Sequence, residues 1–163
     1  MSSPFNLSWI RLNKYRDHTF RVCEILLASL EDRLQGILVF GSLARGTAKY
    51  NAQHQSDIDL LVIVDDLPEN PFARAKLEWE ILGIVGLGVH CIWETPQELK
   101  ELVNAHQAFT FEILRDGQAV FDPQQIFVGL KKTVQELILQ LGIKETKYGW
   151  IWPQKIPGSL IEW

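Results

Sequence analysis

Two short apolar runs, at residues 37–40 and 60–64, constrain the fold of this chain more than any other feature. Continuous runs of four or five apolar residues are typical of strands that are covered on both faces of a sheet. Helical periodicity on either side of them predicts an α/β (α+β) fold, a mixed sheet of four to five strands flanked by helices. With 163 residues and 47% apolar side chains, the chain can bury a substantial core.

Two carboxylates, Asp57 and Asp59, stand at the start of the second run. Because side chains alternate between the two faces of a strand, carboxylates two residues apart project to the same side. Negative charges that close repel each other unless a cation lies between them. Proteins usually hold Mg²⁺ through one or two carboxylates and complete its coordination with substrate phosphates. The pair therefore predicts a divalent metal site.

The first run ends in Gly41 and Ser42, which together suit the binding of a phosphate. Glycine lets an anion approach the backbone, and a helix beginning at Ser42 would direct its free N–H groups toward that anion. Arg45, about one helical turn beyond Ser42, either reaches the phosphate or is a solvated or ion-paired surface residue. A phosphate-binding turn followed by a metal-binding carboxylate pair is typical of nucleotide transfer.

The segments GSLARGTA at 41–48 and SDIDLLVIV at 56–64 resemble the signature of the minimal nucleotidyltransferases of the DNA polymerase beta superfamily. The resemblance implies a metal-dependent enzyme that moves a nucleoside monophosphate from an NTP, expected to be ATP, to an acceptor hydroxyl. Asp57 and Asp59 would be catalytic and would hold Mg²⁺ or Mn²⁺. Gly41, Ser42 and Arg45 would bind the triphosphate.

The strand expected at 89–93 departs from that signature at His90. Relatives carry a third carboxylate there, which helps to hold the metal and accepts the proton of the attacking hydroxyl. A neutral imidazole can accept a proton or bind a metal, but it suits Mg²⁺ poorly. Three alternatives follow. His90 is the working base or ligand, the site binds nucleotide but reacts slowly or not at all, or Glu94 on the same strand face is the true partner of the aspartates.

The segment 48–56 is longer than in the family signature and predicts a polar surface loop. It is either a tolerated insertion or an overhang of the pocket, in which Lys49, Tyr50 or His54 would help to select the substrate.

The remaining pattern divides the chain into a nucleotidyltransferase domain at 1–122 and a C-terminal helix and tail at 123–163 that pack on the same domain. The tail at 143–163 contains two prolines and two glycines, which argue against regular structure. It carries Trp150, Trp152 and Trp163, and either folds back on the core or marks a partner surface. Further helices are expected at 13–34, 72–85, 95–103, 106–115 and 123–141, and an edge strand at 118–121. Thr95 and Glu98 predict a capping box, while His18 and His106 are expected to be structural.

A net charge of −4 argues against a broad basic face, so nucleic acid is an unlikely partner. Cys23 and Cys91 lie in apolar segments and predict buried free thiols and a cytoplasmic location. Neither a signal peptide nor an apolar run of membrane-spanning length (roughly 18 residues) is evident. By resemblance, the expected partner is a helical protein encoded nearby, as in toxin–antitoxin pairs where this chain would be the antitoxin, and a homodimer is compatible with the sequence. The alternative function is a catalytically impaired module that binds nucleotide or neutralises a partner.

Overall fold

The structure, a computed structural model, describes residues 3–86, 88–146 and 149–153. Its centre is a four-stranded sheet with the order β5-β4-β1-β6. Strand β1 pairs antiparallel with β4 and β6, whereas β4 and β5 run parallel. The strands span Leu34–Phe40 (β1), Ile58–Val64 (β4), Val89–Glu94 (β5) and Gln118–Phe121 (β6). The predicted mixed sheet is confirmed, with β6 at its edge.

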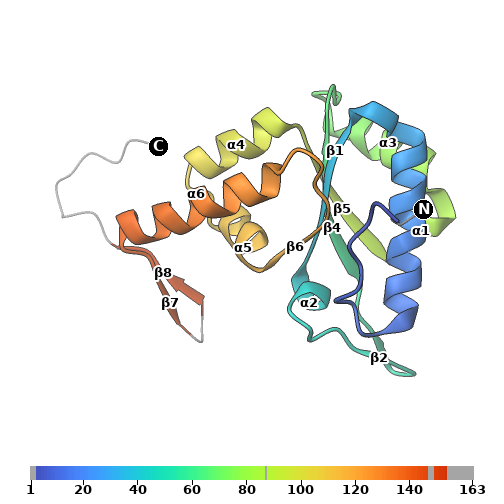
Figure 1. The fold of residues 1–163 in the computed structure, drawn as a ribbon, viewed down its shortest axis with the longest axis horizontal. Coiled ribbons are helices and arrows are strands. Elements are labelled where there is room, and N and C mark those ends of the chain that lie inside the picture. The colour runs from blue at the N-terminus through green and yellow to red at the C-terminus, as the bar shows by residue number, and fades with distance from the viewer. Residues whose placement is uncertain (1–2, 87, 147–148, 154–163) are drawn as a thin grey trace.

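Helices cover both faces of this sheet, as Figure 1 shows. One face is covered by two of them, α1 (Asn13–Leu30) and α3 (Pro71–Leu82), and α3 continues into a 3-10 turn, η2 (Gly83–Gly86). The other face is covered by α4 (Pro96–Asn104), α5 (Ala108–Asp116) and α6 (Ile126–Leu141). Because both faces are covered, the central strands β1 and β4 are continuous apolar runs rather than alternating ones.

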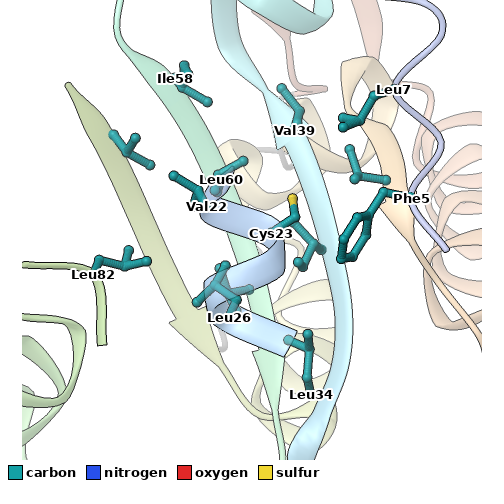
Figure 2. Close-up of a cluster of buried hydrophobic side chains, with 14 of the residues drawn as sticks. Phe5, Leu7, Val22, Cys23, Leu26, Leu34, Val39, Ile58, Leu60 and Leu82 are labelled. Carbon is teal, nitrogen blue, oxygen red and sulfur yellow. The ribbon is translucent and has the colours of Figure 1, made fainter. Parts of the chain in front are cut away.

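Helix α1 buries Val22, Cys23 and Leu26 completely against the sheet (Figure 2). These positions recur at helical spacing and form the stripe that faces β1 and β4. The prediction that this helix continues to Leu34 is wrong. The backbone takes a positive φ of 50° at Glu31, a 3-10 turn, η1 (Glu31–Arg33), follows, and Leu34 is buried as the first residue of β1.

The opposite face has its own core, in which Phe111 and Phe127 are fully buried. A side chain at Gly36 would lie 2.8 Å from the Phe127 ring, so a glycine in β1 makes room for that ring. Helix α6 begins at Ile126 and not at Pro123, because the Asp122 carboxylate accepts hydrogen bonds from the N–H groups of Ile126 (2.7 Å) and Phe127 (3.1 Å).

Two small hairpins complete the described residues. The first joins β2 (Tyr50–Asn51) and β3 (His54–Gln55), and the second joins β7 (Lys144–Thr146) and β8 (Gly149–Ile151). The second hairpin corrects the expectation of an irregular tail, and it arises because Lys144, Glu145 and Thr146 pair in register with Gly149–Ile151.

Within the described part of the tail, Trp150 and Trp152 pack against the second core. The Trp152 ring lies 5.8 Å from the Phe111 ring, and the Arg115 guanidinium lies 4.6 Å over the Trp150 ring. Trp163 lies outside the described residues. The folded-back alternative therefore holds for Trp150 and Trp152.

The capping box and the two cysteines can also be compared with their predictions. The capping box at the start of α4 is present, with Thr95 Oγ1 accepting from the Glu98 N–H at 3.1 Å and Glu98 Oε2 accepting from the Thr95 N–H at 2.8 Å. Cys23 is a buried free thiol, as predicted, whereas Cys91 is free but only partly buried. Burial raises the pKa of the Cys23 thiol to about 12. None of the helices in the described ranges has the length and apolar character needed to cross a bilayer.

Candidate functional site

The site residues predicted from the sequence meet where β1 ends and where β4 and β5 begin. Asp59 lies in β4 and pairs with Phe40 in β1 on one side and with His90 in β5 on the other. Asp57 stands just before β4. The short helix α2 (Gly41–Ala44) follows β1 directly and lies at the lower end of the sheet in Figure 1. Three segments distant in the sequence therefore converge on Asp59.

Gly41 packs directly against the Asp59 carboxylate. A Cβ atom built at Gly41 would lie 2.2 Å from Asp59 Oδ2, a distance that no real side chain tolerates. Gly41 also has a φ of +68°, in the left-handed region that favours glycine. Both the space and the backbone conformation therefore require glycine where the turn and the carboxylate meet.

The imidazole of His90 faces both aspartates. Its Nδ1 lies 3.6 Å from Asp59 Oδ1, and its Nε2 lies 4.0 Å from Asp57 Oδ2. The His90 and Asp57 side chains are open to solvent, whereas only 27% of the Asp59 side chain is exposed. The strand register, which pairs His90 with Asp59, thus places the imidazole beside both aspartates.

Glu94 does not lie beside the aspartates, so the alternative that it is their partner is wrong. It pairs with Ile63, four residues farther along β4, and its carboxylate forms an ion pair of 3.8 Å with Arg74. Arg74 also contacts Glu98 and donates hydrogen bonds to the carbonyls of Pro68 and Trp93. Glu94 therefore belongs to a structural cluster between α3 and α4.

The electrostatics at Asp59 favour the binding of a cation. Burial raises the pKa of the Asp59 carboxyl, and the negative charge of Asp57 raises it further. The nearby His90 and Arg45 act in the opposite direction on the same pKa. Within the described residues, His90 is the only basic side chain with a nitrogen within 4.0 Å of either carboxylate. A divalent cation between the two carboxylates would relieve the cost of ionising Asp59.

The donor set limits what kind of metal site this can be. Across residues 3–86, 88–146 and 149–153, no group of three or more His, Cys, Asp or Glu side chains is arranged to hold a metal ion. Asp57 and Asp59 supply only two carboxylates, and Asp57 is open to solvent. This set is too small for a metal held entirely by protein ligands. The pair does fit Mg²⁺, which commonly takes one or two carboxylates and completes its coordination with water and substrate phosphates.

The turn after β1 has the features expected of a phosphate-binding segment. The amide groups in the first turn of α2 lack partners inside the helix. The Ser42 carbonyl accepts from the Thr47 N–H at 2.9 Å, which closes the loop beyond α2. Arg45 is exposed on this loop, and its charge lowers the pKa values of both Asp59 and Asp116. The structure therefore brings Gly41 and Arg45 close to Asp59.

The insertion at 48–56 is a hairpin fastened to α1 by Tyr15, a contact that the sequence analysis did not identify. The Tyr15 hydroxyl accepts from the Ser56 N–H (3.0 Å) and lies 2.8 Å from the Lys49 carbonyl. Tyr50 hydrogen-bonds to Lys14, which also lies over its ring. Tyr50 is thus engaged with α1 rather than with the carboxylates.

Gly88, directly before β5, is a further residue that shapes the site. Its carbonyl accepts from the Ile58 N–H at 2.9 Å, and its φ is +74°. A Cβ atom at Gly88 would lie 3.9 Å from Asp57 Oδ1. Gly88 therefore sets the start of β5 against the start of β4, beside Asp57. The position of Gly88 directly before the predicted strand at 89–93 is the sequence feature from which this role could have been predicted.

Comparison with known proteins gives one family and a set of structural likenesses. A family model described as polymerase beta, nucleotidyltransferase, matches residues 25–126, more than half of the chain. No curated protein matches this chain. A crystal structure of a toxin–antitoxin with AMP-PNP is 20% identical, with 80% of this chain and 90% of that chain covered and a TM-score of 0.48.

Two further structures have similar values. The MntA–HepT toxin–antitoxin is 16% identical, with 77% of this chain and 88% of that chain covered and a TM-score of 0.47. A structure from Shewanella oneidensis is 18% identical, with 77% and 89% covered and a TM-score of 0.38. These values describe a distant likeness in chain trace.

Proposed function

Because this chain belongs to the polymerase beta nucleotidyltransferase family, we propose that it transfers a nucleoside monophosphate from an NTP to an acceptor hydroxyl. The observation that carries the proposal is the position of Asp59, two residues after Asp57, directly against the Gly41 turn. We propose that Asp57 and Asp59 hold Mg²⁺ together with the triphosphate. When bound, Mg²⁺ neutralises charge on the phosphates and on the leaving pyrophosphate.

The order of the strands suggests a role for each residue. Gly41 follows β1, Asp59 lies on β4 with Asp57 just before it, and His90 lies on β5, which is on the far side of β4 from β1. Phosphoryl and nucleotidyl transfer need the attacking and leaving oxygens roughly in line. Pyrophosphate would therefore leave toward Gly41 and Ser42, with Arg45 as a further phosphate contact, and the acceptor would approach from the side of His90.

His90 is the residue proposed to accept the proton of the acceptor. Its Nδ1 is the nitrogen nearer to Asp59 and would carry the proton of the neutral imidazole, which leaves Nε2 as the base. The exposed position of the imidazole allows an acceptor to reach it.

His90 also supports a second candidate function, nucleotide binding without transfer. Relatives have a carboxylate where this chain has His90, and an imidazole adds no negative charge to a magnesium site. The chain would then bind an NTP without transferring it, as a nucleotide-binding or partner-neutralising module.

The acceptor that we propose is a hydroxyl on a helical partner protein. Exposed apolar surface supports a macromolecular partner. Phe72 and Trp79 lie seven residues apart on one face of α3, with 86% and 64% of their surface exposed. Adjacent to that helix, 78% of Ile84 is also exposed. Groups of exposed apolar residues often mark interaction sites.

Pyrophosphate release and the mass of the acceptor test the proposal. The full chain is incubated with ATP, Mg²⁺ or Mn²⁺, and the protein encoded beside it, and each protein is then weighed by mass spectrometry. Transfer adds one AMP to the acceptor and releases one pyrophosphate, and both are lost in Asp59→Asn. Turnover that His90→Ala abolishes favours the enzyme. Nucleotide binding without turnover, with transfer gained in His90→Asp, favours the binding module.

A further inference from the structure

A small, mostly apolar cavity of about 170 Å³ lies between the sheet and helices α4 and α5, two residues along β4 and β5 from Asp59 and His90. Its floor is formed by Leu61 of β4 and Ile92 of β5, and Leu99 of α4 and Ile113 of α5 close it from above. Leu61, Leu99 and Ile113 are almost completely buried. We refer to this cavity as the apolar slot.

The strand register places the slot two residues along β4 and β5 from the candidate site. Leu61 follows Asp59 by two residues, and Ile92 follows His90 by two residues, so each pair lies on one face of its strand. Two residues of a strand advance by about 7 Å. A ribose would separate the α-phosphate at the aspartates from any base bound in the slot.

Phe109, in the first turn of α5, lines the slot and has 52% of its surface exposed. The ring is held edge-on by Phe40, with ring centres 6.2 Å apart and planes at 85°. Phe40 is in turn the register partner of Asp59. Phe109 is therefore a fixed, half-exposed aromatic surface within reach of whatever is bound at the aspartates.

The polar side chains that line the slot are those of Glu94, Gln107 and Thr110, and the Glu94 carboxylate is ion-paired with Arg74. Gln107 precedes α5, and its Oε1 accepts a hydrogen bond from the hydroxyl of Thr110, which is buried. This contact leaves the Gln107 amide N–H groups as donors at the rim. Apolar walls, one aromatic face and an amide donor suit a flat heteroaromatic ring that carries acceptor nitrogens.

We propose that the apolar slot receives the base of the nucleotide, with Phe109 stacking on it and Gln107 donating a hydrogen bond. The inference rests on the proposed function, because it assumes that the triphosphate binds at Gly41 and the aspartates. It assigns the base to α5, an element that contributes nothing to the phosphate and metal contacts.

Calorimetry with two ligands tests this assignment. The full chain is titrated with ATP and with inorganic tripolyphosphate, each in the presence of Mg²⁺. Loss of base stacking on an aromatic ring typically weakens binding by about tenfold, so Phe109→Ala should weaken ATP binding about tenfold and leave tripolyphosphate binding unchanged. Gln107→Leu should also weaken only ATP. Leu139→Ala, which removes an exposed apolar side chain from α6, should change neither.

Unchanged tripolyphosphate binding also reports that each variant is folded. Equal losses for both ligands in Phe109→Ala, or no loss for ATP, would overturn the inference while the proposed function stands. A Phe109→Ala variant that binds ATP normally but transfers poorly to its acceptor would overturn it in favour of an acceptor side chain in the slot. If the wild-type chain binds neither ligand, the proposed function fails as well.

Discussion

Gly41, in the turn after β1, packs directly against the carboxylate of Asp59 in β4. The carboxylate occupies the space that a side chain at Gly41 would need, since Asp59 Oδ2 lies 2.2 Å from the position of a Cβ atom. The two residues come from neighbouring antiparallel strands, and Phe40, just before Gly41, is the register partner of Asp59. The pairing of β1 with β4 therefore determines the geometry of the site.

Gly41→Ala is expected to damage both stability and ligand binding. A non-glycine residue in the left-handed region costs about 1–2 kcal/mol, and the clash with Asp59 adds to that cost. Gly46→Ala separates the two effects, because Gly46 has a φ of +72° but nothing within 4 Å of its Cβ position. Gly46→Ala should therefore lose only the conformational part.

Thermal unfolding and Mg²⁺–ATP titrations measure this difference. Gly129→Ala is the control for the substitution itself, since it lies in α6 with free space around it and should stabilise the helix by about 0.5–1 kcal/mol. Equal losses in Gly41→Ala and Gly46→Ala would show that the contact with Asp59 contributes nothing.

Asp59→Asn should raise the stability of the metal-free protein at neutral pH. The pKa of Asp59 is raised in the folded protein above the ordinary value of 3.8, mainly by burial. Stability therefore falls as the pH rises from the ordinary pKa through the raised one, and the loss persists at higher pH. Asparagine removes this ionisation cost.

Denaturant unfolding between pH 3 and pH 8 checks the sign. The stability difference between Asp59→Asn and the wild type should be largest at neutral pH and should shrink as the pH falls through the raised pKa. A wild type that is more stable than Asp59→Asn at pH 7 without metal would contradict this account of Asp59.

His90→Asp is expected to destabilise the metal-free protein and to strengthen its response to Mg²⁺. A third carboxylate would replace an imidazole that lies 3.6 Å from Asp59. Charge repulsion at that separation costs about 1 kcal/mol in a solvated site. Thermal unfolding with and without Mg²⁺ measures both effects, with His54→Asp on the exposed first hairpin as the control for added charge. A smaller Mg²⁺ response in His90→Asp than in the wild type would argue against a metal at this position.

Thr95→Ala should destabilise the protein by about 1 kcal/mol, because it removes the oxygen that caps α4. Thr133→Ala in the exposed middle of α6 is the matched control, and its hydroxyl contacts only the carbonyl of Gly129. Chemical denaturation of both variants gives the comparison. Similar free energies of unfolding for the two would show that the capping box is not significant.

The sequence was most informative where a strand is buried on both faces. The runs at 37–40 and 60–64 predicted β1 and β4, and the period of two predicted that Asp57 and Asp59 act together. It was less informative at helix ends. Leu34 continues the apolar spacing of α1, and nothing in its residue type shows that the chain reverses at Glu31.

Contacts between distant segments could not be read from the sequence. The engagement of Glu94 with Arg74 depends on how α3 packs beside β5. Phe109 falls within the helix predicted at 106–115, but its exposure depends on how α5 packs on the sheet. Tyr15 likewise holds the insertion only because α1 begins near Ser56.

The central claim is that Asp57 and Asp59 bind a divalent metal together with a triphosphate held at Gly41. Titration of ATP into the full chain, by calorimetry with Mg²⁺ and again with EDTA, tests it most directly. Saturable ATP binding is expected with Mg²⁺, and it should be lost in EDTA and in Asp57→Asn and Asp59→Asn. Asp66→Asn, beyond the far end of β4, should bind like the wild type. ATP binding that is unaffected by EDTA and by both aspartate substitutions would contradict it.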